Sequence, residues 1–249
     1  MVGRAVLVFT LAVTLLSVGP VGATTLFGPT PYLCFDTATA PAGCGGADSP
    51  FKSLSFSYFF LETFEDHLFN VPGVTASAGG VTSVVFGPSI HDSVDADDGA
   101  IDGSGLLGDS FFSSSGASGI TFTFSAAILG ALPTHVGIVW TDGAGTISFS
   151  ASGLGGALAP CTIVGYSDPG SPDGSVSGTT AEDRFFGCSD PGGISSISIS
   201  NSSGGIEVDH LQYGLLGAGP GPSVPAPASL ILLGSGLICM AVARRLRRR

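Results

Sequence analysis

The sequence has 249 residues, of which 44% are hydrophobic and only 11% charged, with 39 Gly and 16 Pro. Such a chain can bury a core, which excludes a charge-rich disordered protein, and its many Gly and Pro residues disfavour a helical fold. Six of the eight Lys and Arg residues lie near the two ends, which leaves Lys52 and Arg184 against 19 acids in the middle. This acidic middle part excludes nucleic-acid binding, because that affinity rests on Lys and Arg.

The N-terminal segment has the three-part layout of a secretory signal peptide. A short basic start at Met1–Arg4 precedes the apolar run Ala5–Val18, and small residues end at Ala23. The apolar run is shorter than the roughly 20 residues that span a bilayer. We therefore predict a signal peptide over residues 1–23 that is cleaved after Ala23; the alternative is an uncleaved membrane anchor.

Residues 24–218 predict one acidic, all-β domain. Several segments alternate apolar and small polar residues with the period of a half-buried strand: 53–60, 120–125, 146–150 and 196–200. Residues 136–140, which include Trp140, predict a more deeply buried strand, and 206–213 the last one. Turn signals such as Asp142-Gly143 and Pro191-Gly192-Gly193 separate these segments. The pattern indicates an antiparallel β-sandwich or jelly roll.

Four cysteines lie in this domain, and an even number in an exported chain favours disulfides. Pairing Cys34 with Cys44 and Cys161 with Cys188 closes the shortest loops, so we predict these two bonds.

An acidic, Gly-rich segment runs from Asp92 to Asp109. Clustered carboxylates on a flexible loop are the ligands that Ca²⁺ prefers. The segment therefore predicts a Ca²⁺ loop with Asp209 as a further ligand from elsewhere in the domain, and Ca²⁺ is the one cofactor we expect. The alternative is a solvated acidic loop that keeps the protein soluble. The expected loop ligands are Asp92, Asp95, Asp97, Asp98 and Asp102.

Two further charged clusters are Glu182-Asp183-Arg184 and the Glu207, Asp209 and His210 side chains of the last strand. Paired carboxylates can hydrolyse glycosidic bonds when they are held a set distance apart. The other interpretation is structural, with Arg184 as the ion-pair partner of Glu182 or Asp183.

The C-terminal part predicts a linker at residues 219–223 and a tail at 224–249. The tail begins with Val224-Pro225-Ala226-Pro227 and continues with the apolar stretch 230–243, which predicts a single transmembrane helix. Terminal arginines orient the end to the cytoplasm and the domain outside: Arg244, Arg245, Arg247, Arg248 and Arg249.

This tail resembles the PEP-CTERM sorting tails of Gram-negative bacteria, which carry a Pro-Glu-Pro signature, a transmembrane helix and a basic cluster. Ala226 stands where that signature has Glu, so the tail is closer to the Val-Pro-x-Pro variant, in which Gly-Ser-Gly follows, here at 234–236. The resemblance implies an exosortase-type membrane protease as partner and tethering at the inner membrane during sorting. Release to the cell envelope, the surface or the extracellular matrix follows. The alternative is a permanent single-pass anchor.

Four stretches of the middle part resemble a domain type of exported proteins with such tails, which is taken to be a β-sandwich: 91–99, 137–143, 181–187 and 206–210. The resulting hypothesis is a non-enzymatic, exported surface or matrix protein associated with extracellular polysaccharide, with no catalytic residue assigned. One alternative is a secreted glycan-active hydrolase that uses paired carboxylates. The other is a structural matrix protein without a ligand.

Overall fold

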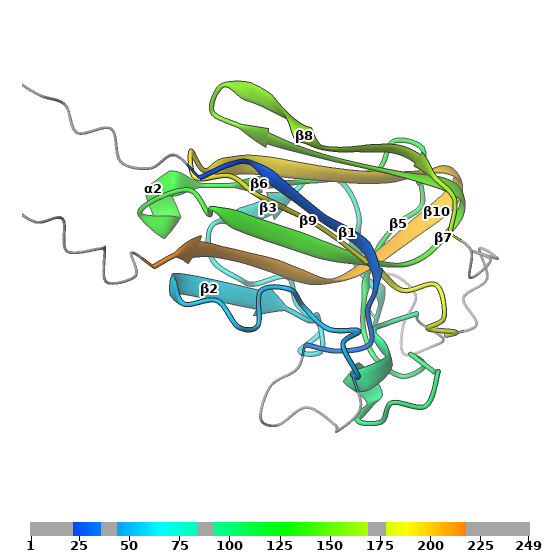
Figure 1. Cartoon of the computed structure of the whole chain (residues 1–249). Helices are drawn as coiled ribbons and strands as arrows, with labels where there is room; N and C mark the ends of the chain where they lie inside the picture. The colour runs from blue at the N-terminus through cyan, green and yellow to red at the C-terminus, as the bar shows by residue number, and fades with distance from the viewer. Residues whose placement is uncertain (1–21, 36–43, 84–91, 169–177, 218–249) are drawn as a thin grey trace, which may run out of the picture.

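The computed structural model describes residues 22–35, 44–83, 92–168 and 178–217 (Figure 1). These residues form one ten-stranded antiparallel sheet with two short helical segments, η1 and α2. The all-β class predicted from the sequence is confirmed. The elements are β1 (Thr25–Pro31), β2 (Phe56–Glu62), β3 (Val74–Ala76), β4 (Gly80–Val81), η1 (Asp95–Asp98), β5 (Phe111–Ser113), β6 (Ile120–Phe124), α2 (Ala126–Leu129), β7 (His135–Gly153), β8 (Gly156–Tyr166), β9 (Arg184–Ser189) and β10 (Ile194–Leu216).

Two long strands, β7 and β10, pair along almost their whole length and carry the other strands. The first half of β7 pairs with β9, which pairs with β1, while the second half of β10 pairs with β2. The second half of β7 pairs with β8, and the first half of β10 with β6, which pairs with β3. Strand β5 pairs with β10 between these halves, and β4 pairs with β5.

Both long strands bend so that the two halves of the sheet face each other. Phe149 lies eleven residues beyond Ile138 on β7, and Ile138 is the cross-strand partner of Phe186 on β9. A straight strand would separate Phe149 from Phe186 by roughly 36 Å, yet their rings stack with centroids 5.9 Å apart. The bend lies where the labels β5, β7 and β10 stand together in Figure 1.

The space between the two halves holds the main hydrophobic core. Alternate residues of β7 (Val136, Ile138 and Trp140) and β10 (Ile206 and Val208) point into it and are buried. On the other face of the sheet, Val139 packs in a second, smaller cluster with Tyr32, Phe51, Val94 and Phe185. The first half of β7 is therefore buried on both faces, as the apolar run 136–140 predicted.

The predicted turn at Asp142-Gly143 is wrong, because both residues lie within β7. The expected strands 136–140 and 146–150 are two parts of this one strand, and 196–200 and 206–213 are two parts of β10. The chain bends there through register irregularities rather than through a hairpin loop. The turn at Pro191-Gly192-Gly193 is confirmed, since it joins β9 to β10.

Both predicted disulfides are present. Cys34 and Cys44 join the segments on either side of the gap after residue 35, with Cα atoms 5.9 Å apart. Cys161 of β8 and Cys188 of β9, with Cα atoms 5.7 Å apart, link the two facing halves of the sheet.

Three predicted segments lie outside the described residues: the signal peptide except for its last two residues, the linker 219–223 and the tail 224–249. Within the described part of the chain, no helix is long and apolar enough to cross a membrane.

Candidate functional site

Buried acidic side chains gather beside the bend of the long strands, on the face of the sheet opposite the main core. Aspartate and glutamate are almost never fully buried unless they are paired. Here six of them are buried in one region: Asp92, Asp142, Glu182, Asp183, Glu207 and Asp209.

A β-bulge brings Asp142 to this face. Glu207 is the cross-strand partner of Asp142, while its neighbour Val208 pairs with Trp140, so Thr141 is an extra residue on β7. Regular alternation would turn Asp142 toward the core, like Trp140. The extra residue turns Asp142 to the opposite face, where Glu207 also points.

Asp142, Asp92 and Glu182 form the first acidic group, which we call the Asp142 group. Each contributes a carboxylate oxygen, and these oxygens all lie within 4.8 Å of one another. The three side chains are 6%, 0% and 2% exposed. Three negative charges so close together, out of water, repel strongly unless protons or a cation neutralise them.

Glu207 adjoins this group. Its Oε1 accepts hydrogen bonds from the Ser110 hydroxyl and from the backbone N–H of Asp92, the latter at 3.4 Å. The pKa of Glu207 is raised to about 7, mainly by burial and in addition by the Asp142 charge, while the two hydrogen bonds oppose the shift.

Asp183 is the most unusual member of the region. It is fully buried, and neither of its carboxylate oxygens has a hydrogen-bond partner among the described residues. Burial raises its pKa well above the usual value, and the charges of Asp92 and Glu182 add to this shift. Its carboxylate therefore lies within electrostatic reach of the Asp142 group.

Arg184 does not pair with Asp183, which corrects the expectation from the sequence. Its Nε and Nη2 atoms bind both oxygens of Asp168, at 2.5 and 2.9 Å. Its Nη1 donates to the backbone carbonyls of Ala181 and Asp183. The guanidinium of Arg184 is therefore engaged with Asp168 in a planar, bidentate pair.

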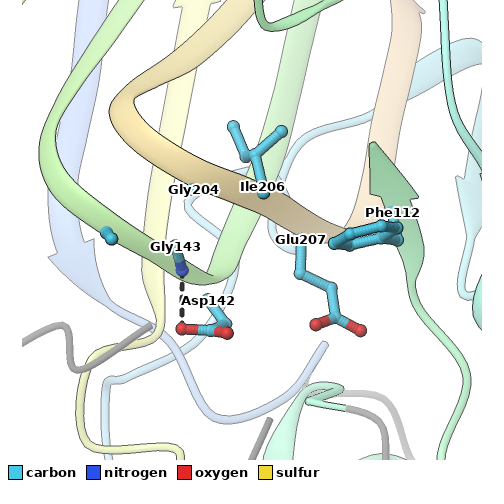
Figure 2. Close-up of a pocket in the computed structure, with 8 residues that line it drawn as sticks. Phe112, Asp142, Gly143, Gly204, Ile206 and Glu207 are labelled. Atoms are coloured by element: carbon cyan, nitrogen blue, oxygen red, sulfur yellow. Dashed lines mark hydrogen bonds between the residues drawn. The ribbon is translucent and has the colours of Figure 1, made fainter. Parts of the chain in front are cut away.

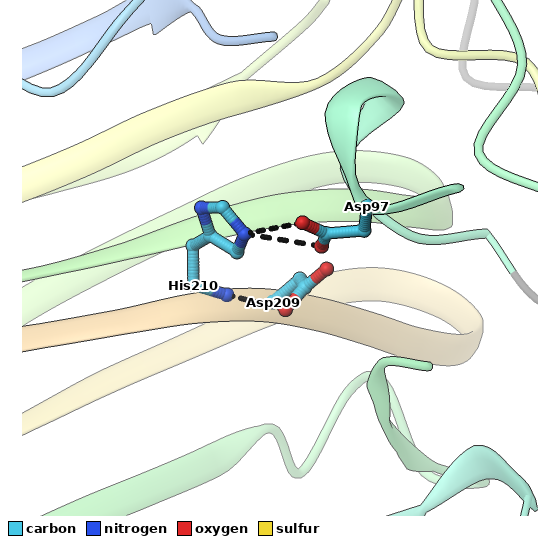
Figure 3. Close-up of side chains that lie close together, drawn as sticks. All are labelled: Asp97, Asp209 and His210. Atoms are coloured by element: carbon cyan, nitrogen blue, oxygen red, sulfur yellow. Dashed lines mark hydrogen bonds and ion pairs between the residues drawn. The ribbon is translucent and has the colours of Figure 1, made fainter. Parts of the chain in front are cut away.

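A second acidic group consists of Asp97, Asp209 and His210 (Figure 3). Successive strand residues normally point to opposite faces, but the register shifts between Asp209 and Gln212, and His210 has a φ of 43°. This left-handed backbone is rare for a residue other than Gly. It allows the side chains of Asp209 and His210, although adjacent in the strand, to lie on the same side near Asp97.

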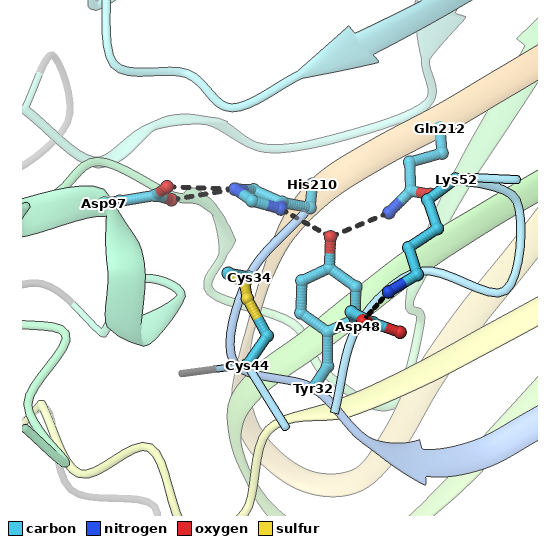
Figure 4. Close-up of a disulfide and its surroundings, with 8 residues drawn as sticks. All are labelled: Tyr32, Cys34, Cys44, Asp48, Lys52, Asp97, His210 and Gln212. Atoms are coloured by element: carbon cyan, nitrogen blue, oxygen red, sulfur yellow. Dashed lines mark hydrogen bonds and ion pairs between the residues drawn. A yellow bond between two sulfur atoms is a disulfide. The ribbon is translucent and has the colours of Figure 1, made fainter. Parts of the chain in front are cut away.

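The second group is internally hydrogen-bonded. Asp209 accepts bonds from the backbone N–H groups of Val94 (3.0 Å) and His210 (2.6 Å). The amide of Gln212 donates to the Tyr32 oxygen (3.1 Å), so the Tyr32 hydroxyl donates to Nδ1 of His210 (2.8 Å). Nε2 of His210 then donates to Asp97 at 3.0 Å (Figure 4). Burial lowers the pKa of His210, which favours this neutral form.

A pocket of 240 Å³ opens beside the Asp142–Glu207 pair (Figure 2). Both carboxylates point the same way in the close-up, and the partly exposed ring of Phe112 lies next to Glu207. Gly143, Gly204 and Gly205 contribute bare backbone to the wall. At Gly205 a Cβ atom would lie 2.5 Å from the Phe112 ring, so a larger residue there would displace the ring.

The five loop aspartates that were expected to bind one Ca²⁺ ion lie in different places in the structure. Asp92 belongs to the Asp142 group and Asp97 to the second group. Asp95 accepts hydrogen bonds from the backbone N–H groups of residues 102–104 and so holds the loop itself. Asp98 and Asp102 are exposed. Asp209, expected as a further ligand, meets Asp97.

Sequence reasoning did not place Asp142, Glu182 and Glu207 beside Asp92. The available signal was charge inside otherwise apolar strands. Glu207 and Asp209 alternate with the core residues Ile206 and Val208, and Asp142 lies two residues after Trp140, where the buried apolar run ends.

A family model of the PEP-CTERM protein-sorting motif matches residues 223–249, outside the described residues. No curated protein and no solved structure matches the chain. The motif implies an exported protein, destined for the cell envelope or surface, that is sorted through its C-terminus with processing by an exosortase-type membrane protease.

Proposed function

We propose that this PEP-CTERM sorting-domain protein is a non-enzymatic component of the cell surface or extracellular matrix that associates with extracellular polysaccharide. The sorting motif at residues 223–249 is the observation that supports this location at the cell surface or in the matrix. In this proposal the tail tethers the chain at the inner membrane through a single helix until the protease releases it. The domain outside is a β-sandwich made of the two facing halves of the sheet.

The pocket beside Asp142 and Glu207 supports the association with polysaccharide. Sugar rings present apolar C–H faces and rows of hydroxyl donors. The Phe112 ring offers an aromatic surface for the apolar faces, and the backbone groups of Gly143, Gly204 and Gly205 can form hydrogen bonds with the hydroxyls. The glycines of the wall let a ligand approach the backbone closely. The acidity of the domain favours neutral polysaccharides over acidic ones.

Affinity electrophoresis with a panel of neutral and acidic polysaccharides tests this association. The unaltered protein and the Phe112→Ala variant are compared. We expect retardation by at least one neutral polysaccharide and its loss in the variant. Phe124→Ala is the matched control, because Phe124 lies in the core away from this pocket. Absence of retardation by every polysaccharide would leave a structural matrix protein as the better account.

A secreted glycan hydrolase is the second candidate. It is favoured by one observation, the raised pKa of Glu207 beside a second carboxylate in a pocket. Glycosidases hold their two carboxyl groups about 5–5.5 or about 6.5–9.5 Å apart. Asp142 and Glu207 are only 6% and 2% exposed, so a glycosidic bond has poor access to either carboxyl group. Release of reducing ends from the same panel, abolished by Glu207→Gln, would establish the hydrolase instead.

A further inference from the structure

We infer that Asp92, Asp142 and Glu182 bind a divalent cation of the Ca²⁺ class, with Asp183 as a nearby charge partner. This site differs from the acidic loop expected from the sequence, with which it shares only Asp92. It goes beyond the proposed function, because the ion would bind whether or not the protein binds polysaccharide.

The spacing of the oxygens fits one ion. Ca²⁺–oxygen distances are about 2.3–2.6 Å, so two ligands on opposite sides of one ion lie roughly 4.6–5.2 Å apart. Oxygens that all lie within 4.8 Å of one another can therefore touch the same cation. The donors are carboxylates alone, which suit Ca²⁺ or Mg²⁺ rather than the softer transition metals.

Asp183 supplies an independent observation. A fully buried carboxylate without a hydrogen-bond donor among the described residues is costly. The side chain lies within electrostatic reach of Asp92 and Glu182. A divalent ion bound by those two residues would offset the charge of Asp183 as well.

The two basic side chains of the domain pair with acidic residues other than Asp92, Asp142 and Glu182. Between residues 24 and 218 the sequence has two, Lys52 and Arg184. Lys52 forms an ion pair with Asp48, and Arg184 binds Asp168 with both arms of its guanidinium. With two basic residues against 19 acidic ones, the domain as a whole carries a large negative charge that favours cations.

The second acidic group fits a cation less well. Asp209 is held by two backbone N–H groups, and both ring nitrogens of His210 are engaged by Tyr32 and Asp97. A metal on His210 would have to replace one of these bonds. Asp142 and Glu182 also accept hydrogen bonds, from the Gly143 N–H at 2.6 Å and the Thr179 hydroxyl at 2.9 Å. A carboxylate oxygen has two lone pairs, so it can accept a hydrogen bond and bind a cation together, whereas a ring nitrogen of His210 cannot.

A bound ion would join three separate segments: the chain before η1, the bend of β7 and the approach to β9. Ligands from distant segments couple ion binding to folding. The ion should therefore raise the melting temperature of the protein, in proportion to the logarithm of its concentration once the site is filled.

The test uses the full chain purified in detergent, with melting curves and calorimetric titration in EDTA, in 1 mM CaCl₂ and in 1 mM MgCl₂. We expect Ca²⁺ to raise the melting temperature and Mg²⁺ to raise it less, since Mg²⁺ sheds its water reluctantly. Asp142→Asn and Glu182→Gln should each weaken Ca²⁺ binding by about 10-fold or more, in the range found for lost metal-site contacts. Asp183→Asn should weaken it as well.

Asp102→Asn is the matched control, because Asp102 is exposed on the acidic loop and should leave Ca²⁺ affinity unchanged. Circular dichroism in EDTA shows whether each variant is folded; if Asp142→Asn is not, Glu182→Gln carries the test. A melting temperature of the unaltered chain that does not respond to Ca²⁺ would overturn the proposal. So would loss of the response in Asp102→Asn with its retention in Glu182→Gln.

Discussion

Asp142 of β7 and Glu207 of β10 are direct cross-strand partners, and the extra residue Thr141 turns Asp142 to the face on which Glu207 lies. Like charges in directly opposed positions destabilise an antiparallel pair. Both side chains are buried, which strengthens the repulsion. The fold accepts this cost at the point where the acidic side chains line a pocket, which makes the pair a candidate for function rather than for stability.

Removing one charge of this pair should stabilise the protein when no divalent ion is present. At pH 8, above its pKa of about 7, Glu207 is ionised and faces the Asp142 charge. Glu207→Gln keeps an acceptor for Ser110 and removes the repulsion. We expect its melting temperature in EDTA to rise by about 2–4 °C, the equivalent of about 1 kcal/mol for a domain of this size. Asp102→Asn should leave it unchanged, and a lowered melting temperature in Glu207→Gln would contradict this account.

The ion pair between Arg184 and Asp168 should be essential for stability. Both side chains are buried, and removing one partner of a buried pair typically costs about 3–5 kcal/mol. Arg184→Gln should therefore lower the free energy of unfolding in urea by that amount. The more exposed pair Lys52–Asp48, whose side chains are 34% and 11% exposed, provides the comparison, because Lys52→Gln should cost less than Arg184→Gln. Equal effects of the two substitutions would argue against a special role for Arg184.

The second acidic group should make stability depend on pH. Burial raises the pKa of Asp97 from 3.8 to about 7, with a hydrogen bond to Asp209 opposing and the Asp98 charge adding to the shift. The folded protein therefore holds a proton that the unfolded chain releases, so this contribution is present at low pH and is lost as the pH rises through about 7. His210, whose pKa is lowered, contributes in the opposite sense.

Asp97→Asn isolates the carboxyl contribution. Its melting temperature in EDTA, relative to the unaltered chain, should increase by roughly 5 °C or more between pH 4 and pH 8, since one pKa unit is equivalent to about 1.4 kcal/mol. Differential scanning calorimetry at steps of one pH unit gives this difference directly. A difference that stays constant over the range would show that Asp97 titrates normally in the folded protein.

The two disulfides should differ in their contribution. The Cys161–Cys188 bond spans 27 residues and links the facing halves of the sheet, while the Cys34–Cys44 bond spans 10. Loop-closure entropy predicts stabilisation of about 3.5 kcal/mol for the first and about 2.7 kcal/mol for the second. Double Cys→Ser variants, unfolded in urea, should show this order. The reverse order would mean that the entropic account does not hold for this protein.

The sequence was informative wherever the evidence was local. Period-two alternation located most parts of the long strands, and the shortest-loop rule paired Cys34 with Cys44 and Cys161 with Cys188. It failed at Asp142-Gly143, where a typical turn signal lies inside a strand. Turn propensity is a weak local preference, and pairing of β7 with β10 on both sides of the bend overrides it.

The acidic site depends on information that a single sequence does not display. The density of aspartates drew attention to the loop 95–102, but Asp98 and Asp102 are exposed there. The buried group forms from Asp92, Asp142 and Glu182, which lie far apart in the chain. Their meeting depends on the register of two strands and on one extra residue at Thr141, and neither can be read from composition or spacing.

The central claim is that the chain is exported and sorted through its C-terminal tail. The most direct test is to measure the intact mass of the protein in the envelope and extracellular fractions. The measurement compares a host that has an exosortase with a strain that lacks it. With the protease we predict a surface form that lacks the apolar stretch 230–243 and the terminal arginines, and without it a form in the inner-membrane fraction that keeps them. A surface form that retains Arg244–Arg249, with the same distribution in both strains, would contradict the account.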